Sequence, residues 1–165
     1  MATMTSSGSA KLTFPSDTQI VITRKFAAPK HLVYRAVTEP ELIKRWWNAK
    51  RGEVTICEVD LREGGKWRYV METPDGFEVA FHGEYRAIVP NERVVTTEAF
   101  EGAPDPDVNA TLNTMTLTED GGTTTITVMI DCPNQFVRDA IVESGMEEGL
   151  QDAYDLLEEV AASLG

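Results

Sequence analysis

The C-terminal segment, residues 135–164, constrains the fold of this chain more than any other stretch. Its apolar residues recur every three or four positions, which predicts one long amphipathic helix whose polar face is almost entirely acidic. The apolar positions are Phe136, Val137, Ala140, Ile141, Met146, Leu150, Ala153, Tyr154, Leu157, Val160, Ala161 and Leu164. Such a helix is stable in water only when this apolar face is buried, so the rest of the chain must provide an apolar surface for it.

Seven segments between residues 18 and 131 alternate apolar and polar side chains, which predicts β-strands with one buried face. They span residues 18–28, 53–60, 65–73, 78–89, 93–100, 109–119 and 123–131. The sequences TPDGF at 73–77 and DGG at 120–122 are typical of hairpin turns. The last six strands are therefore predicted to form an antiparallel meander.

Two short helices are expected between the first strand and the meander. Pro29 suits the start of a helix over residues 30–37. Thr38 is expected to cap a second helix over residues 39–47, with Pro40 in its first turn. The predicted fold class is α+β: a curved antiparallel sheet of about seven strands, with the long helix across its concave face and the two short helices closing one end.

The first 17 residues are rich in Ser, Thr, Gly and Ala and show no apolar period. We expect residues 1–17 to be a mobile tail that contributes little to stability, and residues 18–165 to form a single domain. Where the sheet and the long helix do not touch, the space between them becomes a cavity suited to a small ligand.

Several motifs give the chain a family likeness. They are ITRKFAAPKHLVYRAVTEPELIKRWW (22–47), DLREGGKWRYVM (60–71), DGFEVAFHGEYRAIVPNERVVTT (75–97), DGGTTTITV (120–128) and ESGMEEGLQDAYDLLEEV (143–160). Together they resemble the bacterial homologues of the activator of the heat-shock protein 90 ATPase, within the START-like (SRPBCC) helix-grip superfamily. The resemblance covers residues 20–164 and implies the helix-grip fold and binding of an apolar ligand. After GMEEG the family usually has tryptophan, where this chain has Leu150.

Charge and motif content limit the possible partners. The formal net charge of −12 argues against nucleic acid and against anionic membrane surfaces. No apolar run is long enough to span a membrane, no secretory signal is visible, and Cys57 and Cys132 lack metal-site spacing, so a cytoplasmic protein is expected. With His31 and His82 as the two histidines and no nucleotide or nucleophile motif, we assign no catalytic residue, metal ligand or cofactor. We expect a monomer or homodimer.

All three tryptophans, Trp46, Trp47 and Trp67, lie within residues 42–67. Adjacent helical residues point about 100° apart, so Trp46 and Trp47 cannot share one narrow apolar face. Either the tryptophans seal the curved sheet, or at least one contacts a ligand. Gly145 and Gly149, on one face of the predicted helix, indicate either close packing against the sheet or room for a ligand. The predicted ligand-cavity residues are Trp46, Trp47, Trp67, Tyr69, Met71, Phe81, Tyr85, Asn113, Met115, Met146, Gly149 and Leu150.

Three function classes are compatible with this pattern. The preferred interpretation is a binding module that holds a small apolar or amphipathic ligand between the sheet and the C-terminal helix. The alternative is a cofactor-free enzyme of the cyclase, dehydratase or hydrolase type, which needs an acid or base inside the cavity. Asn113 is the most plausible polar member, whereas Glu84, Arg86 and Glu98 suit a polar cavity end and a solvated outer face equally well. The family resemblance adds a chaperone-associated, stress-response module as a third possibility.

Overall fold

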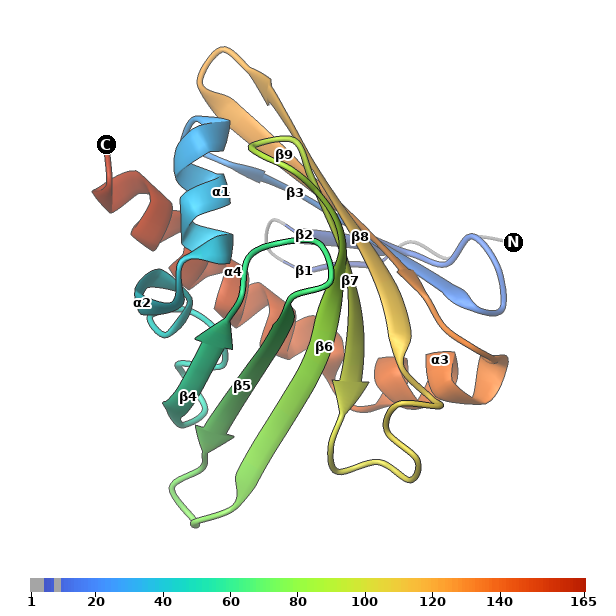
Figure 1. The fold of residues 1–165 in the computed structure, drawn as a ribbon. Helices are drawn as coiled ribbons and strands as arrows, with labels where there is room; N and C mark the ends of the chain where they lie inside the picture. The colour runs from blue at the N-terminus through green and yellow to red at the C-terminus, as the bar shows by residue number, and fades with distance from the viewer. Residues whose placement is uncertain (1–4, 8–9) are drawn as a thin grey trace.

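The computed structural model describes residues 5–7 and 10–165, which form a single antiparallel sheet flanked by helices (Figure 1). Within these residues the sheet has nine strands in the order β1-β2-β3-β9-β8-β7-β6-β5-β4. The strands are β1 (Thr5–Ser7), β2 (Ala10–Thr13), β3 (Gln19–Phe26), β4 (Glu53–Val59), β5 (Lys66–Glu72), β6 (Glu78–Val89), β7 (Arg93–Phe100), β8 (Thr111–Asp120) and β9 (Thr123–Asp131). The helices are α1 (Lys30–Thr38), α2 (Pro40–Ile43), α3 (Gln135–Glu143) and α4 (Met146–Ser163).

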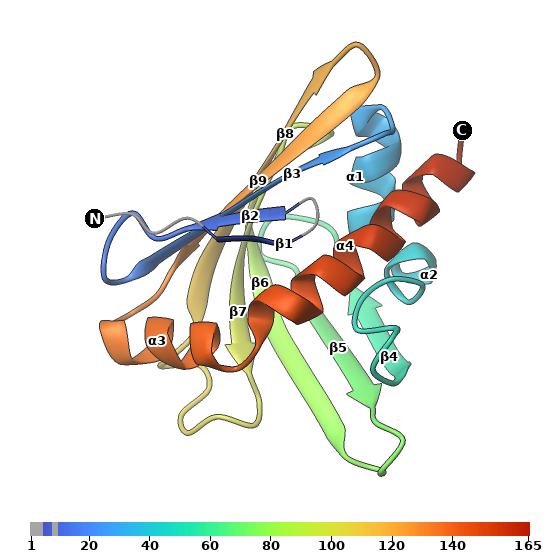
Figure 2. The same cartoon turned by 180° about the vertical axis from the view of Figure 1, so that it is seen from behind.

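The predicted α+β helix-grip fold is confirmed, and all seven predicted strands are present as β3 to β9. The two predicted hairpin turns adopt the backbone their glycines allow: Gly76 has a φ of 85°, and Gly121 and Gly122 have φ of 58° and 82°. β3 pairs with β9, which joins the first predicted strand to the far end of the meander. The sheet curves, and α4 runs across its concave face (Figure 2).

The expectation of a mobile tail over residues 1–17 is wrong for residues 10–13, which form β2 and pair with β3. Ala10 is fully buried and Leu12 is 2% exposed. The side-chain amide of Gln151 in α4 donates to the carbonyl of Ala10 at 3.0 Å and accepts from its N–H at 3.2 Å. β2 is therefore held from one side by the sheet and from the other by α4. Residues 1–4 and 8–9 of the expected tail lie outside the described residues.

The helix predicted over residues 30–37 is confirmed as α1, but the second short helix differs from the prediction. Thr38 does not cap it, because the Thr38 hydroxyl donates to the carbonyl of Tyr34 at 2.7 Å and Thr38 ends α1. α2 ends at Ile43, so Trp46 and Trp47 lie in the turns that follow it rather than on a helix.

The predicted long helix over residues 135–164 is broken into α3 and α4 at Ser144–Gly145. Gly145 has a φ of 85°, the left-handed conformation in which glycine commonly ends a helix. Asn134 starts α3 by accepting a hydrogen bond from the N–H of Val137 at 2.9 Å. The break allows α4 to cross the sheet while α3 lies at one end of it (Figure 2).

The main core lies between α4 and the strands β2, β3, β8 and β9. Leu157 and Ala161 of α4 are fully buried there, together with Ile20, Phe26 and Ile126 from the sheet. Arg24 of β3 is also buried and donates to the Tyr154 carbonyl and to Asp155, so it fixes α4 through a polar contact. None of the described helices is long and apolar enough to cross a membrane.

Candidate functional site

Two neighbouring strands, β5 and β6, place aromatic side chains together on the concave face. In the antiparallel register Trp67 lies opposite Gly83, and Tyr69 lies opposite Phe81, so these residues share one face of the sheet. Tyr85 follows two positions after Gly83 on the same face. Their aromatic rings pack beneath α1, which identifies this face as the one that the helices cover.

Trp47 completes an aromatic wall on this face. Its ring meets Tyr69 edge-on at 5.3 Å and Phe81 at 5.8 Å between ring centres. Trp67 lies 4.6 Å from Tyr69, and Phe100 lies 5.1 Å from Phe81. Trp47, Tyr69 and Phe81 keep part of their surface exposed, although they face the helix side of the sheet. The helices thus leave this part of the concave face partly open.

Two polar side chains lie on the same face, next to the aromatic wall. Glu98 lies opposite Thr111, and the Asn113 amide approaches the Glu98 carboxylate at 3.4 Å. The Thr111 hydroxyl donates to the Asn113 carbonyl at 2.8 Å, which orients the amide. Burial away from water raises the pKa of Glu98 to about 7. We refer to Trp47, Tyr69, Phe81, Glu98 and Asn113 as the concave site.

The hydroxyl groups around the concave site stay neutral at physiological pH. Burial raises the pKa of Tyr69, Tyr85 and Tyr154, and the negative charge of Glu98 contributes to the increase at Tyr69 and Tyr154. Because Tyr154 belongs to α4, Glu98 lies between the sheet and this helix. Within the described residues, the buried indole nitrogen of Trp67 has no hydrogen-bond partner, which leaves a donor unused beside the site.

The remaining predicted cavity residues are not among the five residues of the concave site. The Trp46 indole donates to the carbonyl of Ala36 at 2.8 Å and packs on the main core. Met71 is 4% exposed. Three others, Met115, Met146 and Leu150, pack against the main core. The alternation of residues in the sequence does not distinguish Glu98 from an outward-facing residue, so the sequence alone does not identify the carboxyl group of this site.

The three atoms nearest to a Cβ built at Gly149 belong to Arg51, and none belongs to the sheet backbone or to the concave site. A Cβ atom there would meet the guanidinium of Arg51 at 3.4 Å, which lies over this turn of α4. A Cβ at Gly145 would meet none of the described residues within 4 Å. Close packing on the sheet is therefore wrong for both glycines, whereas room for a ligand at Gly149 stays a prediction.

We expect Gly149→Ala to raise the free energy of unfolding by about 0.5–1 kcal/mol, because alanine is the better helix residue and the exposed end of Arg51 can move aside. Urea unfolding followed by far-UV circular dichroism measures this change. A loss of stability would mean that the Arg51 position over α4 is itself an important contact.

The outer face of the sheet carries the other candidate polar groups. Arg86 is exposed and Glu84 is half-buried, and their side chains pair at 3.4 Å, so neither belongs to the concave site. His82 contacts Glu101 at 2.9 Å and Asp107 at 2.6 Å, and hydrogen bonds to these carboxylates raise the pKa of His82. This cluster attaches the loop between β7 and β8 to the outer face of the sheet.

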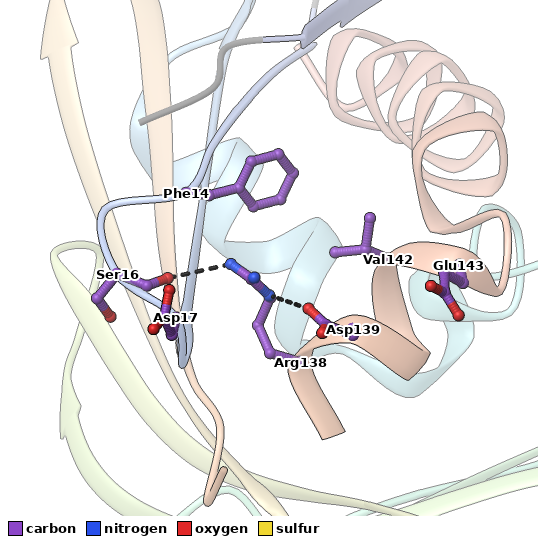
Figure 3. Close-up of a pocket in the computed structure, with 7 residues that line it drawn as sticks. All are labelled: Phe14, Ser16, Asp17, Arg138, Asp139, Val142 and Glu143. Atoms are coloured by element: carbon purple, nitrogen blue, oxygen red, sulfur yellow. Dashed lines mark hydrogen bonds and ion pairs between the residues drawn. The ribbon is translucent and has the colours of Figure 1, made fainter. Parts of the chain in front are cut away.

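A separate pocket of about 220 Å³ lies between the β2–β3 turn and α3 (Figure 3). Arg138 extends across it, donates to the Ser16 carbonyl at 3.1 Å and to Asp139 at 2.8 Å, and lies over the ring of Phe14. Its cation is thus used to hold α3 against the turn. The residues that line the pocket are Phe14, Ser16, Asp17, Arg138, Asp139, Val142 and Glu143, and none of the predicted cavity residues is among them. A second pocket, near Gly52 and Glu72, likewise contains none of them. The ligand-cavity assignment therefore stays a prediction.

One family model matches the chain, and several solved structures are similar to it in sequence and fold. The sequence profile described as "Activator of Hsp90 ATPase homolog 1-like protein" matches residues 27–162. A solved structure from Rhodobacter sphaeroides is 26% identical, with a TM-score of 0.85 over 93% of this chain and 99% of that chain. Protein NE0264 from Nitrosomonas europaea is 26% identical, with a TM-score of 0.78 over 91% and 97% of the two chains. Protein Ms6760 from Mycobacterium smegmatis is 25% identical, with a TM-score of 0.80 over 96% of both chains. A search among curated proteins gave no match.

Proposed function

The chain belongs to the family described as Activator of Hsp90 ATPase homolog 1-like protein, and from this premise we propose that it binds a small amphipathic molecule at the concave site. The observation that carries the proposal is the combination, on one partly open face, of an aromatic wall with an inward carboxyl group. When a ligand covers apolar surface that is partly exposed on the helix side of a sheet, that surface is removed from water and binding is favoured. The polar groups beside it would fix the orientation of that ligand.

The arrangement separates the two ends of such a ligand. Trp47, Tyr69 and Phe81 offer a large apolar contact area, and these rigid side chains lose little conformational entropy when a ligand binds. Glu98 and Asn113 offer a carboxyl and an amide at the other end. A ligand contacts both ends of the site when its apolar body lies on the rings and its polar head lies at Glu98.

The test uses an uncharged fluorescent probe, N-phenyl-1-naphthylamine, whose emission rises in apolar surroundings. We expect Phe81→Ala to weaken probe binding by about tenfold, because it removes apolar contact area from the wall. Phe77→Ala is the matched control, because Phe77 lies in the neighbouring β5–β6 turn and is 70% exposed. Equal losses in both variants, or no probe binding to the unaltered protein, would contradict the proposal. Native mass spectrometry of freshly purified protein is an independent measurement, because it identifies any molecule that the protein retains.

A cofactor-free enzyme is the second candidate, and one observation favours it. Glu98 has a pKa of about 7 on the helix side of the sheet, and a group with such a pKa can both donate and accept protons near neutral pH. If a molecule recovered with the protein is converted by it, Glu98→Gln should abolish the conversion while leaving binding in place. Conversion that survives this change would exclude Glu98 as the acid or base.

A further inference from the structure

We propose that the ligand of the concave site is a cationic amphiphile, an amine whose ammonium group pairs with Glu98 while its apolar chain lies on the aromatic wall of Trp47, Tyr69 and Phe81. This inference rests on the proposed function and names the ligand class for the same site. It follows from three features: the uncompensated charge of Glu98, the aromatic rings beside it, and the weaker binding expected for anionic and uncharged ligands.

Glu98 has no cationic partner within the described residues. It forms none of the salt bridges there, and its side-chain contact is the Asn113 amide at 3.4 Å. The buried cation of the main core, Arg24, is already engaged by Asp155 at 2.9 Å and by Glu158 at 3.5 Å. A partly buried carboxylate without a counter-charge is unfavourable, and a bound ammonium group would supply that charge.

The aromatic wall favours the same charge. Ring faces attract ammonium groups, and the attraction is larger where water is excluded. Trp47 meets Tyr69 and Phe81 edge-on, so the three rings point in different directions around the site. A protonated amine between these rings and the Glu98 carboxylate would be stabilised from both sides.

Other classes of ligand are expected to bind the concave site more weakly than an amine. A carboxylate ligand would bring a second negative charge beside Glu98, and like charges in a desolvated site repel strongly. An alcohol would leave the Glu98 charge uncompensated. Two features could nevertheless favour an anion or an alcohol: the indole N–H of Trp67, which has no partner in the part of the chain that the structure describes, and the guanidinium of Arg51 over Gly149. The experiment therefore compares all three classes directly.

Glu98 is the group around the site that titrates near neutral pH. From β5 and β6 it is faced by Tyr69 and Tyr85, and from α4 by Tyr154, all with pKa raised by burial. The Cys57 thiol of β4, which lies opposite Tyr69, has its pKa raised by burial to about 11. Amine binding should thus follow the ionisation of Glu98 alone.

The test titrates the protein with octylamine, octanol and octanoate, which share one chain length, and follows tryptophan fluorescence and heat. At about pH 8 we expect octylamine to bind at least about tenfold tighter than octanol, and octanoate more weakly than octanol. Octylamine affinity should fall about tenfold between about pH 8 and about pH 6, because Glu98 with a pKa near 7 takes up a proton in that range. In Glu98→Gln, octylamine and octanol should bind within about threefold of each other, without this pH dependence.

Glu84→Gln is the matched control, because Glu84 undergoes the same chemical change on the outer face of β6 and should keep the amine preference. Tighter binding of octanol or octanoate to the unaltered protein would overturn the amine assignment and leave the proposed function standing. An amine preference that persists in Glu98→Gln would also overturn it. Binding of none of the three molecules at any pH would instead contradict the proposed function. The pH dependence of the unaltered protein is decisive even if the Glu98 variant folds poorly.

Discussion

Removal of residues 1–17 is expected to unfold the protein or to lower its melting temperature by more than about 15 °C. The deletion removes β2, whose Leu12 is 2% exposed, and truncating a buried leucine alone costs about 2–5 kcal/mol. It also leaves the Gln151 amide of α4 buried without either of its hydrogen bonds to Ala10, at about 1–3 kcal/mol for each unsatisfied group. Together these losses approach the whole stability of a typical domain, which is about 5–15 kcal/mol.

Deletion of residues 1–9 is the matched control, because it leaves Ala10 and Leu12 in place. Thermal unfolding by circular dichroism should place most of the loss between the shorter and the longer deletion. A 1–17 deletion that melts within a few degrees of the full chain would mean that β2 contributes nothing, and that the sheet effectively ends at β3.

The strands β3 to β9 were predictable because local rules specify each of them. Alternation marks their buried faces, and DGG and PDG mark their turns, so no long-range information is required. β2 was missed because AKLT contains only two apolar residues, and its strand is specified by partners far away in sequence. One of these partners, Gln151, lies 141 residues along the chain from Ala10.

The break between α3 and α4 could have been predicted from the Ser144–Gly145 pair, since glycine favours the left-handed conformation that ends helices. The apolar spacing continues across the break, and this continuity concealed it. A helical period reports which side chains are buried, but it does not require that one uninterrupted helix carries them.

The orientation of Glu98 could not be predicted from alternation alone. Val94 and Val95 are adjacent and both are 7% exposed, so the sequence of β7 does not show which parity faces the helices. The register shift between Tyr85 and Ala87 in the neighbouring strand adds to this ambiguity. The strand pairing of Glu98 with Thr111 and its contact with Asn113 place Glu98 on the face that the helices cover. Both depend on the three-dimensional structure, so the sequence of β7 alone does not reveal them.

Gly83→Ala is expected to destabilise the protein by about 3 kcal/mol or more, the largest effect we expect from a single added methyl group. A Cβ at Gly83 would lie 1.8 Å from the backbone oxygen of Thr97 and 2.7 Å from the indole nitrogen of Trp67. A backbone oxygen cannot rotate away, so β6 and β7 would have to separate at this point. The same movement would displace Glu98, which follows Thr97 in β7.

Two measurements on the Gly83 variant test this account together. Urea unfolding should show the loss of stability, with Gly149→Ala as the matched control because the same chemical change there should stabilise the protein. At urea concentrations where the variant remains folded, octylamine binding should also weaken by about tenfold or more, because the Glu98 carboxylate no longer faces the aromatic wall. A stable Gly83→Ala protein would show that the strands can separate at little cost. A destabilised variant with full amine affinity would show that the close approach of β6 and β7 serves the sheet alone and does not position Glu98.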